Sequence, residues 1–256
     1  MASVVPLERL EDVYSPELDN RRDVLVYLPP SYPQGRRRYP VLYMHDGQNL
    51  FDPATSFAGD WGMGRSMNAA ARRGLEAIVV GVPHLGVTRL DEYGPWHDES
   101  SGAGGRGDAY LAFLADTLKP LVDSRFRTRR GRDQTVIAGS SMGALISLYA
   151  LFHRPETFGA AGVLSPSLWF AGGAIFPHIE RARVVPARIY LDIGAQEGAH
   201  HVANARRLRN LLLAKGYGRG RDLCWRESGQ GGHDERSWGR RFARALPFLL
   251  PPPRAP

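Results

Sequence analysis

The chain has 256 residues, which is enough to bury a substantial core as one large α/β domain or two small ones. With 43% hydrophobic and 23% charged residues it reads as an ordinary globular protein, and no apolar run approaches the roughly 18 residues that a membrane helix needs. The net charge of +7 comes almost entirely from arginine, but these arginines form no stripe interleaved with aromatic residues, which argues against nucleic-acid binding.

Strand and helix patterns alternate along the first half of the chain. A short continuous apolar run such as VLYM is typical of a strand covered on both faces, whereas apolar residues spaced three and four apart predict an amphipathic helix. The polar, glycine-rich stretch 84–107 shows no periodicity, as is common for functional or mobile loops of that length. The predicted strands of this half are 22–28, 41–44 and 75–82, and the predicted helices are 62–73 and 108–123.

The second half repeats a strand followed by a helix until the chain ends. Strands that alternate with helices form a parallel sheet with helices on both faces. We therefore expect an α/β fold with a mostly parallel central sheet. The predicted strands of this half are 135–141, 159–167, 187–195 and 222–228, and the predicted helices are 142–154, 173–182, 200–215 and 235–249.

No linker or internal repeat divides the chain. We expect one domain over residues 1–256, with a short N-terminal tail and a proline-rich C-terminal tail. Residues 1–15 carry acids where a signal peptide would be apolar, and no small-residue cleavage site follows, which favours a cytoplasmic protein. The lone cysteine, Cys224, excludes an internal disulfide and is expected to be a buried structural thiol on its strand.

The segment AGSSMGA (138–144) joins a predicted buried strand to a predicted helix. It contains the pattern G-x-S-x-G, whose glycines let strand and helix approach and whose serine is lifted clear of the sheet. Ser141 occupies the serine position, while Ser140 occupies the first x and is expected to point away. A serine hydroxyl is a poor nucleophile without a base to take its proton, so the pattern alone is a weak signal.

A base and an acid follow the serine at the same edge of the predicted sheet. His233 lies in the loop GQGGHD after the last strand, and Glu197 follows the strand before it within DIGAQEGAH. A histidine can take the serine proton, and a carboxylate can fix the histidine tautomer and stabilise the imidazolium. The chain order of serine, acid and histidine is the order found in α/β-hydrolases, so Ser141, Glu197 and His233 are predicted to act together.

Other polar residues near these motifs have simpler interpretations. Asp192 competes with Glu197 as the acid, but it falls inside its predicted strand and is expected to be a buried or edge polar group. His200 and His201 begin a predicted helix, where surface or capping roles are expected. His45 follows the strand 41–44, and a structural role in the turn is expected there.

Four stretches together resemble the putative-esterase family of α/β-hydrolases: PVLYMHDGQNLFD (40–52), GSSMGA (139–144), SPSLWF (165–170) and GGHDERSW (231–238). That family includes enterochelin-esterase-like and esterase D-like proteins, feruloyl and acetyl-xylan esterases, S-formylglutathione hydrolases and mycolyltransferases. The similarity extends from about residue 13 to 248 and implies the α/β-hydrolase fold. It matches Ser141 with the nucleophile, His233 with the base and Glu197 with the acid, a position where many relatives have aspartate.

The resemblance also indicates which groups surround the serine. The backbone N–H of Met142 is expected to stabilise a developing oxyanion, and the second donor is expected from Gly47 or Gln48 in the loop after the strand 41–44. Loops at the same edge supply candidates for contact with substrate, although aromatic residues there also suit ordinary packing. These candidates are Asp60, Trp61, Tyr93, Trp96, Ser165 and Trp169.

These residues predict a serine esterase that cleaves carboxylic esters of small molecules through an acyl-enzyme on Ser141. Two alternatives remain open: an acyltransferase that uses the same residues to pass the acyl group to a sugar or another alcohol, and a non-catalytic binding protein with a hydrolase fold. No metal-ligand cluster or dinucleotide motif is present, so neither metal nor cofactor is expected, nor a nucleic-acid or membrane partner. The sequence indicates no oligomeric state.

Overall fold

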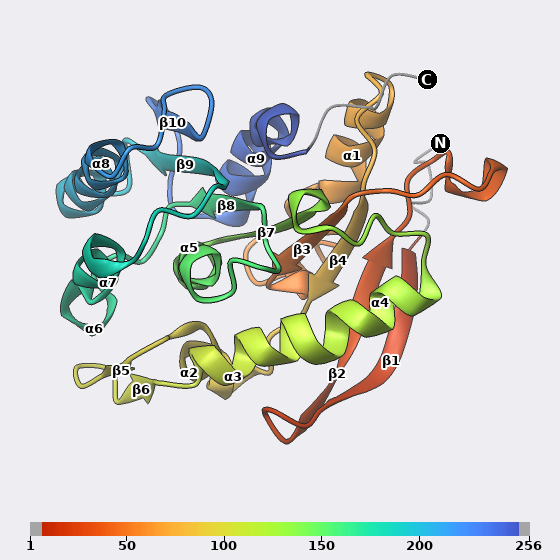
Figure 1. The fold of residues 1–256 in the computed structure, drawn as a ribbon, viewed down its shortest axis with the longest axis horizontal. Coiled ribbons are helices and arrows are strands. Elements are labelled where there is room, and N and C mark those ends of the chain that lie inside the picture. The colour runs from red at the N-terminus through yellow and green to blue at the C-terminus, as the bar shows by residue number, and fades with distance from the viewer. Residues whose placement is uncertain (1–6, 251–256) are drawn as a thin grey trace.

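The centre of the computed structural model, which describes residues 7–250, is an eight-stranded sheet (Figure 1). The strand order is β1-β2-β4-β3-β7-β8-β9-β10, with β1 and β2 antiparallel to their neighbours and all later pairs parallel. This architecture confirms the predicted α/β fold with a mostly parallel sheet. The strands are β1 (Leu7–Ser15), β2 (Asn20–Tyr27), β3 (Val41–His45), β4 (Ile78–Val82), β7 (Thr135–Ser140), β8 (Ala160–Leu164), β9 (Arg188–Gly194) and β10 (Leu223–Ser228).

Helices cover both faces of the sheet. Helices α1 (Met63–Ala71) and α9 (Glu235–Leu249) pack on one face, where Met67 and Phe242 share a buried cluster with the strands (Figure 1). The remaining long helices pack on the other face and form the larger cluster. They are α3 (Gly107–Ala112), α4 (Lys119–Arg125), α5 (Met142–His153), α7 (Ile175–Arg181) and α8 (Ala199–Ala214). A π-helical turn over Phe113–Leu118 joins α3 to α4. The short helices α2 (Arg89–Tyr93) and α6 (Phe170–Gly173) lie in loops.

The continuous apolar run of β3 follows from this layered arrangement. Val41 and Tyr43 belong to the cluster on one face of the sheet, and Leu42 and Met44 belong to the cluster on the other. Side chains alternate between the two faces of a strand, and both faces of β3 are covered by helices. Each of its positions therefore has to be apolar, which removes the alternation that marks a half-exposed strand.

Two regions differ from the sequence-based expectation. The strand β1 has no predicted counterpart, because most of its residues are exposed and a β-bulge between Leu10 and Val13 interrupts its alternation. The stretch 84–107 is not without structure: it contains α2 and a small hairpin of β5 (His97–Asp98) and β6 (Ala103–Gly104). These elements are too short to produce a recognisable period.

The predicted terminal tails fall on residues 1–6 and 251–256, which lie outside the described residues, as does the beginning of the stretch 1–15 on which the cytoplasmic prediction rests. Within 7–250, none of the helices combines the length and the apolar character that crossing a bilayer would require.

The predicted buried thiol, Cys224, is only partly buried on β10, and burial raises the pKa of that thiol.

Asp192 is a carboxylate inside the sheet. It lies on β9, is fully buried, and has Arg241 Nη1 of α9 at 3.4 Å from Oδ1. Burial raises the pKa of Asp192 to about 7, although the charge of Arg241 acts in the opposite direction. The folded protein therefore binds a proton at Asp192 between about pH 4 and pH 7, where an unfolded chain has already released it. Ionisation of this group costs folding stability as the pH rises through that range.

We expect Asp192→Asn to gain stability relative to the wild type as the pH rises from 5 to 8. The amide cannot ionise, so the variant escapes the penalty that the wild type incurs. Between pH 5 and pH 8 the relative gain should come to about 3 kcal/mol, because Asp192 stays protonated in the folded protein for about two pH units above pH 5 and one pKa unit corresponds to about 1.4 kcal/mol. Denaturant unfolding of both proteins at several pH values measures it.

A matched control is Asp133→Asn, because the Asp133 side chain is 73% exposed. It should show no comparable change with pH. If the stability difference between Asp192→Asn and the wild type is the same at pH 5 and pH 8, the buried carboxylate does not titrate in this range.

Candidate active site

Ser141 lies at the turn between β7 and α5 in a conformation that is rare for serine. Its backbone has φ 56° and ψ −120°, and its N–H donates to the carbonyl of Leu164 on the neighbouring strand at 3.0 Å. The turn is possible because strand and helix touch: a Cβ at Gly139 would lie 2.9 Å from the carbonyl carbon of Gly143. Strained positive-φ positions of this kind are found where the surrounding structure holds a functional side chain in place.

A continuous hydrogen-bond chain starts at the Ser141 hydroxyl. His233 Nε2 lies 3.0 Å from Ser141 Oγ, and His233 Nδ1 lies 2.9 Å from Glu197 Oε2. The imidazole packs edge-on against Trp238, with 4.8 Å between the ring centroids. The next residue, Asp234, caps α9 by accepting from the backbone N–H of Ser237 at 2.8 Å, so the helix start anchors the loop that carries the histidine.

Glu197 is held by the oxygen that does not face the histidine. Its side chain is 1% exposed, and Oε1 accepts hydrogen bonds from three donors. Burial alone would raise the pKa of Glu197, but hydrogen bonds from His233 and these donors, together with the Arg241 charge, place it below its ordinary value. The group is therefore a carboxylate at neutral pH. The donors to Oε1 are Ser165 Oγ at 2.6 Å, the Gly194 N–H at 2.8 Å and Arg241 Nη2 at 3.1 Å.

Ser165 and Arg241 form the support behind this carboxylate. Ser165 Oγ accepts from Arg241 Nη2 at 2.7 Å and from Trp238 Nε1 at 3.0 Å, and donates to Glu197. Ser165 is 1% exposed, so it does not line a cleft as the sequence-based interpretation expected. Its hydroxyl faces Glu197 because the loop after β8 is bound to β9, where the Ser165 N–H donates to the carbonyl of Asp192 at 3.0 Å. Arg241 was not identified from the sequence, since an arginine within a helix carries no motif.

The polar residues that compete with Ser141 and Glu197 for their predicted roles lie apart from this hydrogen-bond chain. Among the contacts of residues 7–250, neither Ser140 nor Asp192 has a hydrogen bond to His233. Ser140 is the buried last residue of β7, and Asp192 faces Arg241. His201 begins α8 with its ring 6.4 Å from that of His233, close enough to border the site but outside hydrogen-bond range.

The predicted oxyanion donors surround the start of α5. Met142 is the first residue of that helix, where backbone N–H groups have no helical partner. Gly47 and Gln48 belong to a short 3-10 turn, Gly47–Asn49, that follows β3. The chain just before this turn lies against α5, since a Cβ at Gly143 would be 3.0 Å from His45 Cβ. The donor roles of Met142, Gly47 and Gln48 stay predictions.

His45 is a structural residue in this turn. It is buried, with Nδ1 2.9 Å from the hydroxyl of Tyr110 and its ring packed at a tilt against that of Tyr93, with 5.1 Å between the ring centroids. Burial lowers the pKa of His45 to about 3, so the ring is neutral at physiological pH. The structure thus agrees with the structural role expected for it.

A hollow of about 390 Å³, here called the front hollow, opens beside Ser141 and His233. Its most polar feature is a bidentate ion pair in which Arg89 Nε and Nη2 lie 2.7 and 2.9 Å from the two carboxylate oxygens of Asp46. Asp46 belongs to the HDG turn, whereas Arg89 lies on α2 and is part of no motif recognised in the sequence. The further lining residues are Asn49, Phe57, Ala58, His84, Ser140, Glu235 and Trp238.

A second hollow of about 650 Å³, the side hollow, lies on the other side of the same serine and histidine. Trp169, 42% exposed, lines it together with Ser167, whose hydroxyl is 3.0 Å from Ser141 Oγ. The remaining lining residues are Glu197, His200 and His201. Trp169 is the one predicted substrate contact among the six that borders either hollow.

Four other predicted contacts are directed elsewhere. Trp61 is buried against Trp238 and Phe242 on the α9 side of the sheet. Tyr93 is fully buried on His45, because a large ring near the sheet gains more from the core than from the loop surface. The other two are Trp96, which packs on Tyr149 and His178, and Asp60, which lies 3.6 Å from Arg65.

Comparison with known proteins assigns the chain to a family. The family model described as "Putative esterase" matches residues 15–249. Protein YbbA of Bacillus subtilis, which is uncharacterized, is 28% identical over 242 residues that cover 90% of this chain and 92% of YbbA. The siderophore triacetylfusarinine C esterase of Aspergillus fumigatus is 30% identical over 179 residues, covering 65% of this chain and 58% of that protein.

Solved structures show the same fold. The enterobactin esterase FES from Shigella flexneri superimposes with a TM-score of 0.78 at 22% identity, over 97% of this chain and 60% of that one. The chain thus spans little more than half the length of these two named esterases. The family match covers most of the chain and includes the turn with Ser141, Glu197 and the loop with His233. The chain belongs to the putative-esterase family of α/β-hydrolases and is a carboxylic ester hydrolase.

Proposed function

We propose that the protein hydrolyses small-molecule carboxylic esters through an acyl-enzyme on Ser141. The observation that carries this proposal is the hydrogen-bond chain from Ser141 Oγ through His233 to Glu197. In the first step His233 Nε2 takes the hydroxyl proton as Oγ attacks the ester carbonyl. The imidazolium that forms is stabilised by the Glu197 carboxylate and then protonates the departing alcohol.

The second half of the reaction reverses these roles. Water enters where the alcohol has left, His233 takes its proton, and the hydroxide attacks the acyl carbonyl. The proton then returns to Ser141 Oγ as the acid product leaves. The backbone N–H groups of Met142 and of Gly47 or Gln48 are proposed to stabilise the oxyanion in both halves. The negative charge develops at the first turn of α5, where the helix dipole is also favourable.

The two hollows suit the two parts of an ester. They meet at Ser141 and His233, so an ester carbonyl above the serine would extend one substituent into each. Arg89 and Asp46 neutralise one another in the front hollow. This hollow therefore favours a polar substituent, whether its partial charge is positive or negative, over a purely anionic one. The names of the relatives support a siderophore-type ester as substrate, which a panel of p-nitrophenyl esters, a catechol trilactone and a feruloyl ester would test.

Acyl transfer to an alcohol is the second candidate, because the side hollow offers room for an acceptor next to the serine. An alcohol that binds there would replace water in the second half of the reaction.

Ser141→Ala is expected to abolish ester hydrolysis, with a loss of at least about 10³-fold in kcat, while its melting temperature stays close to that of the wild type. The variant lacks the oxygen that forms the acyl-enzyme. A fluorophosphonate should label the wild type and Ser140→Ala equally and should not label Ser141→Ala. Labelling that is kept in Ser141→Ala and lost in Ser140→Ala would move the nucleophile back by one residue.

Glu197→Gln is expected to lower kcat by up to about 10⁴-fold, because an amide can donate to the imidazole and favour the wrong tautomer. Asp192→Asn is the matched control: Asp192 is a buried carboxylate on β9, the strand that precedes Glu197, and has no hydrogen bond to His233, so the variant should retain most of the activity. Steady-state kinetics on the best ester of the panel separate the two. Wild-type activity in Glu197→Gln, or an equal loss in both variants, contradicts the assignment.

Product partition distinguishes hydrolysis from acyl transfer. With a p-nitrophenyl ester and an excess of glycerol or trehalose, we expect the free acid to account for nearly all of the released acyl group, measured by mass spectrometry. If the new ester is the main product, and Trp169→Ala in the side hollow reduces its share, the protein is an acyltransferase.

A further inference from the structure

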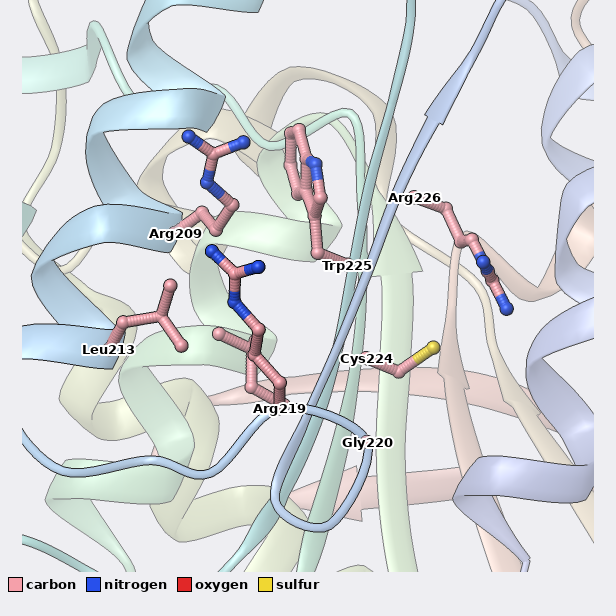
Figure 2. A pocket seen from close by; sticks show the side chains of 8 residues that line it. Arg209, Leu213, Arg219, Gly220, Cys224, Trp225 and Arg226 are labelled. Carbon is pink, nitrogen blue, oxygen red and sulfur yellow. The ribbon is translucent and has the colours of Figure 1, made fainter.

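A third hollow lies behind the proposed catalytic residues, between β10 and α9. It measures about 690 Å³ and is here called the rear hollow. β10 is the last strand of the sheet, and its residues alternate between two environments. Figure 2 shows Cys224 and Arg226 on the side of α9, whereas Trp225 lies with Arg209 on the opposite side, towards α8. Arg226 therefore faces the rear hollow, which it lines together with Arg241 and Arg244 of α9.

The two arginines at its mouth have no acidic partner. Arg226 and Arg244 are exposed, and within residues 7–250 neither forms an ion pair with a carboxylate. Many other surface arginines of this protein do have one: Arg206, for example, lies 2.6 Å from Glu227, a residue of β10 that also lines the rear hollow. The Glu227 carboxylate is thus paired with Arg206, whereas Arg226 and Arg244 carry positive charge that no carboxylate of the described residues pairs.

The floor of the rear hollow contains buried polar atoms without hydrogen-bond partners. Arg241 Nε and Nη1 and both carboxylate oxygens of Asp192 have none within the described part of the chain. Arg241 is 5% exposed and Asp192 is fully buried. A buried donor without a partner is unfavourable, so an acceptor that reaches Arg241 would be stabilised there. The Asp192 carboxyl, whose pKa burial raises, offers an O–H when it is protonated and then does not repel an anion.

We propose that the rear hollow binds a small oxyanion, a carboxylate or a tetrahedral phosphate or sulfate, on the guanidinium groups of Arg226, Arg241 and Arg244. Guanidinium matches such anions because its N–H groups form paired, charge-assisted hydrogen bonds with two oxygens at once. Two exposed arginines would capture the anion, and the buried one would hold it at the floor.

Arg241 connects the rear hollow to the proposed active site. Its Nη2 donates to Glu197 Oε1 at 3.1 Å and to Ser165 Oγ at 2.7 Å, while its Nη1 faces Asp192. An anion on Nε and Nη1 competes for the same positive charge and weakens its attraction for the Glu197 carboxylate. Occupation of the rear hollow therefore changes the turnover rate. This second part rests on the proposed role of Glu197, whereas anion binding does not.

Binding is tested by titrating sodium sulfate and sodium acetate into the Ser141→Ala and wild-type proteins at constant ionic strength, followed by calorimetry. We expect saturable 1:1 binding of at least one anion with the same affinity in both proteins. The tetrahedral and planar probes distinguish a phosphate-like ligand from a carboxylate. Arg226→Gln/Arg244→Gln should weaken binding by about tenfold or more, since hydrogen bonds to charged groups are strong.

The matched control is Arg183→Gln/Arg240→Gln, which removes the same net charge from exposed residues that do not line the rear hollow. It should bind the anion as the wild type does, and both double variants should melt near the wild-type temperature without anion. Absence of saturable binding, or equal weakening in the two double variants, overturns the proposed site.

Coupling is measured on the wild type as the effect of a saturating anion on kcat with the best ester substrate. We expect a change of about twofold or more, which disappears in Arg226→Gln/Arg244→Gln but not in the control. If the anion binds but kcat does not change, the proposed coupling is wrong, while the proposed anion site stands. If the protein hydrolyses no ester, the calorimetry with Ser141→Ala still decides whether the rear hollow binds anions.

Discussion

The arrangement of this protein depends on a carboxylate that is removed from water. The Glu197 side chain is 1% exposed, and a buried ionised carboxylate is stable only when donors replace its lost hydration. Those donors come from β9, from the loop after β8 and from α9, which brings together segments that are far apart along the chain. Holding Oε1 in this way leaves Oε2 free to orient His233, so the support of Glu197 and the orientation of His233 are one structural problem.

Parallel topology solves that problem at a single edge of the sheet. β7, β9 and β10 all end there, and each is followed by one member of the hydrogen-bond chain. The same topology leaves the last strand half covered, because α9 packs on β8 and β9 rather than on β10. The rear hollow and its arginines are a consequence of that incomplete cover, and Arg241 belongs both to the hollow and to the support of Glu197.

Residues differ in how far sequence reasoning could locate them. Ser141, Glu197 and His233 follow strands whose apolar runs are easy to recognise, so their meeting at one edge could be expected from chain order. Ser165 was expected to touch substrate, yet its hydroxyl supports the acid. Trp61 and Tyr93 were also expected in the cleft, but burying a large ring in the core outweighs leaving it on a loop. Nothing local in a sequence distinguishes these outcomes, since a loop may turn its side chains either way.

The sequence by itself determined most of the order of strands and helices, the mostly parallel sheet and the three residues that follow its strand ends, because hydrophobic periodicity and short turn motifs are local properties. Only the tertiary structure decided which donors surround Glu197, which aromatic residues enter the core and where the hollows lie. The direction of Arg241, for example, depends on β9, on the loop after β8 and on the face that α9 presents to the sheet. Contacts of this kind join residues tens of positions apart, and they exist only once the helices have packed on the sheet.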